Sequence, residues 1–311
     1  MQYTLHQLQI FLKITETKSI TKAADELNLT QPAVSIQLKK LQEQFDIPLT
    51  EVIGRQLYIT HFGNEIAITA QKVLDEVATI NYKSKTFQGI LSGKLMLSVV
   101  STGKYVMPYF LSDFLNKNKG IDLVMDVTNK SKVVKSLENN EIDFALVSIL
   151  PDDIQLQSEV LLENKLYLIG NHSVSTENFY DNTVLFHEFP LLFREEGSAT
   201  RLVMENYLQS NGLQSAKKIQ LTSNEAVKQA VIAGMGYSIM PIIGLKNELE
   251  NGTLKIIPMK GFPIQSSWHL VWLRNKSMRP IAEAYLKYIK EEKSNLRNEY
   301  FSWIDNYIIE V

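Results

Sequence analysis

A chain of 311 residues is longer than one hydrophobic core usually supports, so two or three domains are expected. With 45% apolar residues, 21% charged residues and no cysteine, the composition excludes a disordered or fibrous protein, disulfides, thiolate metal sites and cysteine nucleophiles, and it favours the reducing cytoplasm. The net charge is −2, and residues 1–88 hold nine basic and nine acidic side chains, so any nucleic-acid binding must depend on where individual charges lie.

The first segment predicts an amphipathic helix, because apolar residues recur there at spacings of three and four: Leu5, Leu8, Phe11 and Leu12. It has no basic start and no unbroken apolar run, so it is not expected to be an export signal. No stretch of the sequence is long and apolar enough to span a bilayer, and no membrane partner is expected.

A second, short helix is expected over residues 21–27. The hydroxyl of Thr21 can cap the free amides of its first turn, and the small side chains of Ala23 and Ala24 allow another helix to cross closely. Residues 28–29 then form a tight turn.

Thr30 is expected to cap the third helix, and Pro32 lies in its first turn, where a missing amide hydrogen costs little. At about 100° per residue, Val34, Leu38 and Leu41 fall on one side and predict the packed face. The opposite side carries Gln31, Pro32, Ser35, Ile36 and Lys39.

Two short helices joined by a tight turn are typical of a unit that places the start of its second helix in the DNA major groove. Gln31 and Ser35 could then reach base edges, while the lysines further along would contact phosphates. Ile36 could contact a thymine methyl group or a partner helix. The same pattern also fits another all-α module whose polar face stays solvated. The candidate DNA-binding residues are Thr30, Gln31, Pro32, Ser35, Ile36, Lys39, Lys40 and Arg55.

The segment ITKAADELNLTQPAVSIQLKKLQEQF resembles the helix-turn-helix of the LysR-type transcription regulators, including the two alanines, the TQPAVS start and the downstream leucine. The resemblance implies a wing after it, where residues 57–59 alternate as a short strand and Arg55 would contact a phosphate or the minor groove. The family usually has more arginine in this loop. Glu51 and a single arginine therefore predict weaker, more salt-sensitive wing contacts.

A long helix is expected from a cap at Thr60 to about Phe87, with an apolar seam formed by Ile66, Ala70, Val73, Val77, Ile80 and Phe87. The seam could lie on its own protein, but the resemblance favours a dimerisation helix. A dimer contacts two DNA half-sites about one helical turn apart, which would turn weak single contacts into useful affinity. The expected partners are double-stranded DNA and a second copy of the chain, in a dimer or a tetramer, with RNA polymerase as a further candidate.

From Lys94 onward, strands and helices alternate, which predicts a parallel sheet. The first set lies at residues 95–148 and a second at 191–240, and a strand at 268–273 with a helix at 280–290 returns to the first set. Two such subdomains with crossing connections form a cleft, and ligands bind at the carboxyl ends of the strands. The organisation resembles the periplasmic-binding-protein-like effector domain of the same family.

Polar residues at these strand ends predict the ligand site. Hydroxyls and helix-start amides can bind an anion together, and two arginines in FREEGSATR favour a carboxylate or phosphate. Helix capping and surface pairing are the alternative: Arg194 could be neutralised by Glu195 or Glu196, and capping is the stronger reading for Ser223 and Asn224 taken alone. The candidate effector-binding residues are Ser101, Thr102, Thr128, Asn129, Arg194, Ser198, Thr200, Arg201, Ser223 and Asn224.

The segments VVSTGKY and LFREEGSATR resemble those of the LysR regulators that control carbon-fixation operons, which implies a phosphorylated or acidic metabolite. The five histidines are scattered without ligand spacing, and no nucleophile elbow, P-loop or dinucleotide fingerprint is present. No metal, no cofactor and no enzymatic activity are therefore expected. The alternative function is a solute-binding or enzymatic α/β protein with an N-terminal assembly module.

The predicted protein is multidomain, with an all-α winged helix-turn-helix N-terminal domain, a long linker helix and an α/β effector domain of two subdomains. After the last expected helix, Leu296, Tyr300, Trp303 and Tyr307 recur at helical spacing and could pack on their own domain or on another subunit. The expected boundaries are 1–61 for the DNA-binding domain, 62–89 for the linker helix, 94–293 for the effector domain (subdomain I 94–168 and 266–293, subdomain II 169–265) and 294–311 for a C-terminal extension.

Overall fold

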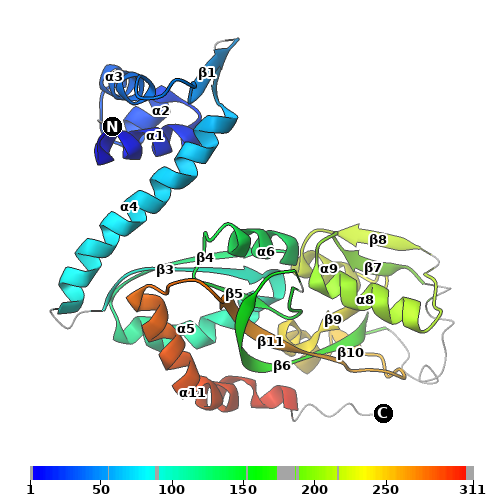
Figure 1. Ribbon diagram of the computed structural model, residues 1–311. Coiled ribbons are helices and arrows are strands. Elements are labelled where there is room, and N and C mark those ends of the chain that lie inside the picture. The colour runs from blue at the N-terminus through cyan, green and yellow to red at the C-terminus, as the bar shows by residue number, and fades with distance from the viewer. Residues whose placement is uncertain are drawn as a thin grey trace. The chain divides into compact units, whose positions relative to one another are not determined.

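The structure is a computed structural model that describes residues 3–54, 56–87, 91–151, 153–173, 186, 189–215 and 217–305, without the side chains of residues 81–87. The chain divides into two compact units, Met1–Ile90 and Leu91–Val311, and each is considered by itself (Figure 1). Within the described ranges, no helix combines the length and the apolar character that a membrane span requires.

The N-terminal unit is a winged helix followed by a long helix. Strands β1 and β2 form an antiparallel hairpin in which Thr50 lies opposite Ile59. In chain order the elements are α1 (Leu5–Thr17), α2 (Ile20–Glu26), α3 (Gln31–Gln42), β1 (Thr50–Ile53), β2 (Gln56–Ile59) and α4 (His61–Phe87).

The core of this unit gathers the inner faces of α1, α2 and α3 against the start of α4. Val34, Leu38 and Leu41 are buried, which confirms the predicted inner face of α3. Leu5 is exposed, however, because the buried stripe of α1 passes through Ile10 and Ile14 instead.

Side chains at the helix starts satisfy first-turn amides. The hydroxyl of Thr30 accepts the N–H of Ala33 at 3.4 Å, as predicted for α3. The prediction for α2 is wrong by one residue at its start: Ser19 has extended backbone angles, and its hydroxyl accepts the N–H of Lys22 at 3.3 Å. Thr21 already lies inside the helix, where it cannot act as the cap.

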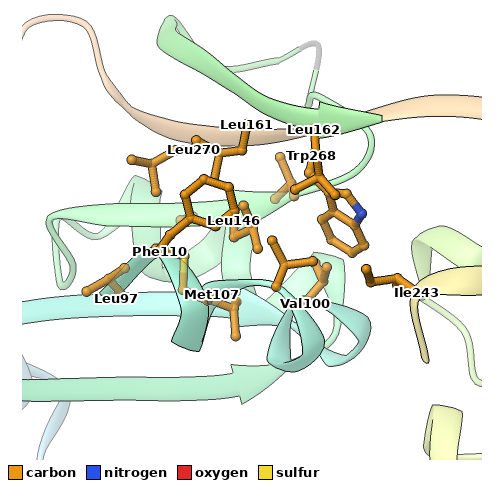
Figure 2. Packing of buried hydrophobic residues seen from close by; sticks show 14 of the residues in the cluster. Leu97, Val100, Met107, Phe110, Leu146, Leu161, Leu162, Ile243, Trp268 and Leu270 are labelled. Atoms are coloured by element: carbon orange, nitrogen blue, oxygen red, sulfur yellow. The ribbon is translucent and has the colours of Figure 1, made fainter. Parts of the chain in front are cut away.

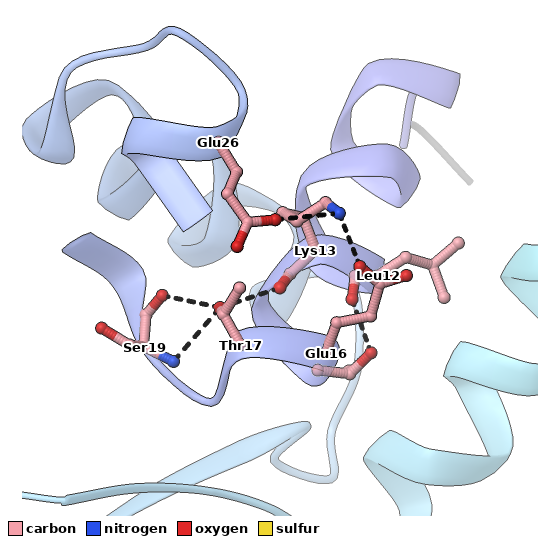
Figure 3. Close-up of polar contacts among 7 residues, drawn as sticks. Leu12, Lys13, Glu16, Thr17, Ser19 and Glu26 are labelled. Atoms are coloured by element: carbon pink, nitrogen blue, oxygen red, sulfur yellow. Dashed lines mark hydrogen bonds and ion pairs between the residues drawn. The ribbon is translucent and has the colours of Figure 1, made fainter. Parts of the chain in front are cut away.

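A polar cluster fixes the turn between α1 and α2 (Figure 3). Lys13 Nζ lies 2.6 Å from Glu16 and 3.2 Å from Glu26, so it ties α1 to the end of α2. Hydrogen bonds from Lys13 to these two carboxylates raise its pKa. The hydroxyl of Thr17 donates to the carbonyls of Lys13, at 2.9 Å, and Ser19, at 3.0 Å. These bonds set the direction in which α2, and hence α3, leaves α1.

The C-terminal unit contains the remaining elements, which are β3 (Ser92–Val100), the 3-10 helix η1 (Ser101–Tyr105), α5 (Met107–Lys117), β4 (Gly120–Thr128), α6 (Lys130–Glu138), β5 (Phe144–Val147), β6 (Leu156–Asn171), β7 (Leu191–Arg194), α8 (Ala199–Ser210), β8 (Lys218–Leu221), α9 (Asn224–Ile232), β9 (Ser238–Pro241), the 3-10 helix η2 (Ile242–Gly244), α10 (Lys246–Glu250), β10 (Leu254–Ile256), β11 (Ile264–Leu273) and α11 (Pro280–Asp305). Figure 1 shows α6 on one side of β3 and β4, with α5 and α11 on the other.

One seven-stranded sheet has the order β10-β6-β11-β5-β3-β4, with β9 also paired to β6, and β7 and β8 form a separate pair. Neighbours are parallel among β3, β4 and β5 and between β7 and β8. The predicted parallel sheet is therefore wrong for the main sheet, which is mixed. Strands β6 and β11 run antiparallel because the chain leaves along one and returns along the other.

The main core lies between this sheet and its helices, and Figure 2 shows part of it around Trp268 and Phe110. A smaller core lies beneath β7, α8 and β9, where Leu191, Phe193 and Met204 are buried. The α/β two-subdomain architecture is thus as predicted, although β1, β6 and β10 were not identified from the sequence.

Helix α11 was expected to end near Lys290 but continues to Asp305. Leu296, Phe301 and Ile304 are buried in the main core, so this segment packs on its own unit. Tyr307 lies outside the described residues.

Asp143 is a buried carboxylate that joins three parts of the C-terminal unit. It accepts the backbone N–H of Met96 in β3 at 2.9 Å and forms an ion pair with Arg279, the residue before α11. Lys276 Nζ lies 3.9 Å away. The side chain of Asp143 is fully shielded from solvent, so its charge depends on these partners.

Asp143→Ala is expected to lower the free energy of unfolding of the C-terminal unit by about 3 kcal/mol, because it leaves the buried N–H and the cation without a partner. Urea unfolding followed by circular dichroism measures this. Asp126→Ala, which changes an exposed aspartate on β4, is the control and should shift the midpoint little. Equal shifts for both variants would contradict the assigned role.

Candidate functional site

The outward face of α3 presents the predicted DNA-binding residues. Gln31, Pro32, Lys39 and Lys40 are exposed, and Ile36 has 53% of its surface exposed. Ser35 is half-buried on the same helix. The predicted facing of α3 is therefore confirmed, and its start is free to approach a ligand, since Thr30 is exposed as well.

Helix α3 is held against α1 by a polar contact as well as by the core. The side-chain amide of Gln7, which is buried, donates to the side-chain oxygen of Gln37 at 3.2 Å. Gln7 also belongs to the capping box of α1, in which its side chain accepts the N–H of Thr4 at 2.8 Å. Sequence analysis did not single out this pair, which orients the exposed face of α3.

The wing follows α3 as the β1–β2 hairpin. A groove of about 690 Å³ lies between β2 and the start of α2. Its polar lining includes Lys18, Ser19, Thr21, Gln56 and Tyr58. Of these, the sequence pointed only to Thr21, and only as a helix cap. Arg55, the predicted wing contact, lies outside the described residues. The groove offers hydroxyl and amide donors and one lysine. These groups can donate hydrogen bonds to phosphate oxygens, mostly without adding charge.

The predicted apolar seam of α4 divides into two parts. Ala70 is buried and Ile66 half-buried against the core of the N-terminal unit. Further along, Val73 is 40% exposed and Ile80 is 66% exposed. The start of the seam thus packs on its own protein, whereas its later residues present apolar surface.

In the C-terminal unit, six predicted effector residues line one cleft: Ser101, Thr102, Asn129, Arg194, Ser198 and Thr200. They come from the ends of β3, β4 and β7 and from the starts of η1, α6 and α8. The cleft encloses about 10 Å³, which is roughly the space that one water molecule needs. Any larger ligand must therefore move side chains or the two walls.

A wider groove of about 610 Å³ adjoins this cleft and shares Lys130 and Ser198 with it. Arg201, a predicted site residue, lies here rather than in the narrow cleft. The groove also contains acids, including Asp153 and Glu205. Its charge is therefore mixed rather than uniformly basic.

Both predicted arginines are paired with carboxylates. Buried Arg194 donates to Glu195 through Nε at 2.8 Å and Nη2 at 2.9 Å, so the alternative of local neutralisation holds for this residue. Arg201 Nε donates to Glu205 at 2.8 Å, and its Nη1 donates to Gln220 at 2.7 Å. An anionic ligand would have to share or replace these partners.

The remaining predicted residues behave differently. Asn129 and Ser223 cap α6 and α9, accepting the N–H groups of residues 132 and 226 at 3.1 and 3.0 Å. Thr128 ends β4 but does not line the narrow cleft. Asn224 is 1% exposed, and neither its amide nitrogen nor its oxygen has a hydrogen-bond partner in the described part of the chain. Its side chain acts on the hydroxyl of Tyr105, whose pKa it lowers, and it lines neither the narrow cleft nor the wider groove.

Two contacts join the walls of the cleft. The N–H of Ser131 in α6 donates to the carbonyl of Gly197 before α8 at 3.3 Å. The hydroxyl of Tyr105, at the end of η1, donates to Glu225 in α9 at 3.0 Å. Sequence analysis missed Tyr105, Ser131 and Glu225, because nothing in the local pattern links residues so far apart.

The electrostatics of the second contact favour this hydrogen bond. Burial raises the pKa of Tyr105 to about 12, so its hydroxyl keeps its proton. Burial acts to raise the pKa of Glu225, but hydrogen bonds from Gln229, Lys228 and Tyr105 outweigh it and lower that pKa. Lys228 in turn lies 2.7 Å from Glu248 of α10.

Gly197→Ala is expected to destabilise the C-terminal unit by about 2 kcal/mol or more, because an added Cβ would lie 2.5 Å from the hydroxyl oxygen of Ser131 and the backbone φ is +80°. Gly212→Ala is the matched control, with φ of +64° and no atom within 4 Å of the added carbon, and should cost roughly 1 kcal/mol. Thermal unfolding compares the two. An equal loss of stability in Gly212→Ala would show that the contact between α6 and the Gly197 loop does not contribute to stability.

Residues 5–64 match the family model "Bacterial regulatory helix-turn-helix protein, lysR family", and residues 88–294 match "LysR substrate binding domain". The chain is 34% identical to the HTH-type transcriptional activator CmpR of Synechocystis over 92% of this chain and 94% of that protein. It is 32% identical to a RuBisCO operon transcriptional regulator of Allochromatium vinosum, with coverage of 95% and 98%.

Two solved structures are also similar. The regulatory domain of Synechocystis CcmR in complex with 2-PG is 32% identical, with a TM-score of 0.62, and covers 66% of this chain and 99% of that domain. Full-length CbnR in complex with its target DNA has a TM-score of 0.71 at 18% identity, covers 93% and 99% of the two chains, and shows the fold. The named relatives are transcription regulators and not enzymes. The chain belongs to the LysR family of transcription regulators, with the carbon-fixation regulators as its relatives.

Proposed function

We propose that this regulator binds a palindromic double-stranded DNA site as a homo-oligomer and responds to a small phosphorylated carboxylate in the cleft of its C-terminal unit. The protein would act in the cytoplasm, where the chromosome lies, and RNA polymerase is a candidate partner at the promoter. The observation that carries the proposal is the convergence of hydroxyl, amide and guanidinium groups from three strand ends on one narrow cleft.

The DNA contact is proposed for the exposed face of α3. Gln31 and Ser35 stand near the start of the helix, where a recognition helix reaches base edges, and Lys39 and Lys40 stand one to two turns later. Because the charges of residues 1–88 balance, one winged helix has little general attraction for phosphates. Exposed Val73 and Ile80 on α4 supply an apolar surface through which a second copy could add its own contacts.

The ligand class is proposed from the chemistry of the cleft. Hydroxyls of Ser101, Thr102 and Thr200 can donate to anionic oxygens. Lys130 adds positive charge, and Arg194 would do so where an anion replaces Glu195. Helix α8 begins at the cleft and has no side-chain cap, so its first N–H groups are available to an anion, whereas those of residues 131 and 132 in α6 already bond to Gly197 and Asn129. The 2-PG complex of a relative with 32% identity supports a ligand that carries both phosphate and carboxylate.

Gln31→Ala and Ser35→Ala are each expected to weaken binding to a duplex selected from random sequences by the wild type by about tenfold, because each removes a base contact. Binding to unrelated DNA should stay the same. Lys40→Ala should weaken binding to every sequence and reduce the salt slope by about one. Fluorescence anisotropy across a salt series measures these effects.

Lys287→Ala, which removes an exposed lysine of α11, is the control and should leave DNA binding unchanged. Wild-type binding to no selected duplex, with or without metabolites, would falsify the DNA-binding proposal. Loss of affinity in Lys287→Ala equal to that in Lys40→Ala would instead show that only overall charge matters.

Thermal-shift measurements with 2-phosphoglycolate, 2-phosphoglycerate and inorganic phosphate test the cleft. A ligand at a hundred times its Kd should stabilise the wild type by about 2.7 kcal/mol. Thr102→Val keeps the shape of a buried cleft residue but removes its hydroxyl, so the stabilisation should fall. Thr69→Val, the same change at an exposed position of α4, should respond like the wild type. Equal stabilisation of all three proteins would place the ligand outside the cleft.

A further inference from the structure

The final part of α11, residues 294–305, begins where the match to the substrate-binding family model ends, at residue 294. It is nevertheless well packed, since Leu296, Phe301 and Ile304 are each at most 4% exposed. The contacts of this segment reach two separate parts of the C-terminal unit.

On one side, the segment packs against α5 and β6. The ring of Phe301 stacks on Phe110 with 5.8 Å between centroids and meets Tyr109 edge-on at 5.4 Å. Asp305 lies 3.5 Å from Lys165 of β6. These partners precede the part of the chain that leaves the sheet at the end of β6 and returns at the start of β11. That part is the excursion.

On the other side, the segment reaches α10, which belongs to that excursion. Lys246 Nζ, at the start of α10, lies 5.5 Å from the ring centroid of Trp303, within range of a cation–π interaction. Leu245, the residue before α10, is buried in the main core, and Leu249 of α10 packs against it, as does half-buried Trp303. Residues 294–305 therefore contact both the fixed part of the sheet and the excursion.

From α10, polar contacts continue to the cleft. Glu248 lies 2.7 Å from Lys228, and Lys228 lies 3.2 Å from Glu225. Glu225 accepts the hydroxyl of Tyr105, the last residue of η1, and η1 begins with Ser101 and Thr102, which line the cleft. The ring of Tyr105 also lies against Gly244 of η2, where an added Cβ would be 2.6 Å from it.

We propose that residues 294–305 form a brace that fixes α10 against α5 and β6 and so limits opening of the cleft. Subdomains joined by two strands move by hinge bending, and a helix that contacts both sides of the hinge opposes that motion. The brace thus sets the fraction of molecules with an open cleft. Its consequence for ligand affinity rests on the proposed ligand site, but the brace itself does not.

Hydrogen exchange of the full-length protein without ligand tests the brace. Trp303→Ala and Lys246→Met each remove the contact between α11 and α10, the second without touching the buried residues of α11. Both are expected to speed amide exchange in residues 101–105 and 222–226 by at least about threefold, because the walls of the cleft separate more often.

Ser302→Ala is the matched control: it changes the exposed neighbour of Trp303 in the same segment and should leave exchange in both regions unchanged. If Trp303→Ala unfolds the end of α11, exchange rises in α11 itself and Lys246→Met decides. Unchanged exchange in Lys246→Met, or an equal rise in Ser302→Ala, overturns the brace. Failure of every phosphorylated ligand to bind would leave this result intact and count against the ligand site alone.

Discussion

The pairing of β6 with β11 is the constraint on which the C-terminal unit depends. The two strands run antiparallel from Leu156 opposite Leu273 to Leu166 opposite Ile264, with one shift at Trp268. One carries the chain out to β7, α8, β8 and α9, and the other returns it to α11. Because both paths are held side by side by ladder hydrogen bonds, the outer segment joins the rest of the sheet along two neighbouring strands, and the ends of β3 and β7 face each other across a cleft.

What the sequence could predict depended on the range of the interactions involved. The facing of α3 follows from residues a few positions apart, and its cap at Thr30 needs only the next three residues, so both were predicted. The prediction of the α2 cap was wrong because Ser19 and Thr21 can cap equally well by local chemistry. The α1–α2 turn decides between them. The prediction of a parallel main sheet was wrong because strand direction depends on the crossing connections, which leave no local sequence pattern.

The candidate site shows the same division. Strand ends with hydroxyls were found because parallel neighbours place their carboxyl ends at one edge, and six of those residues do meet. Tyr105 and Glu225 were missed because 120 positions separate them. The helical spacing after Lys290 was noted, although the helix itself was expected to end there. The partner of Trp303 is a lysine of a short helix, and spacing within one helix cannot reveal it.

Glu195 supplies the counter-charge of Arg194, so the narrow cleft is neutralised without a ligand. A buried guanidinium without a counter-charge would destabilise the fold, and the neighbouring carboxylate removes that penalty with two short hydrogen bonds. In the proposed ligand site, Glu195 would compete with an anion for Arg194. Because it is the next residue in the chain, it would act at a high effective concentration and would raise the anion concentration needed to fill the cleft.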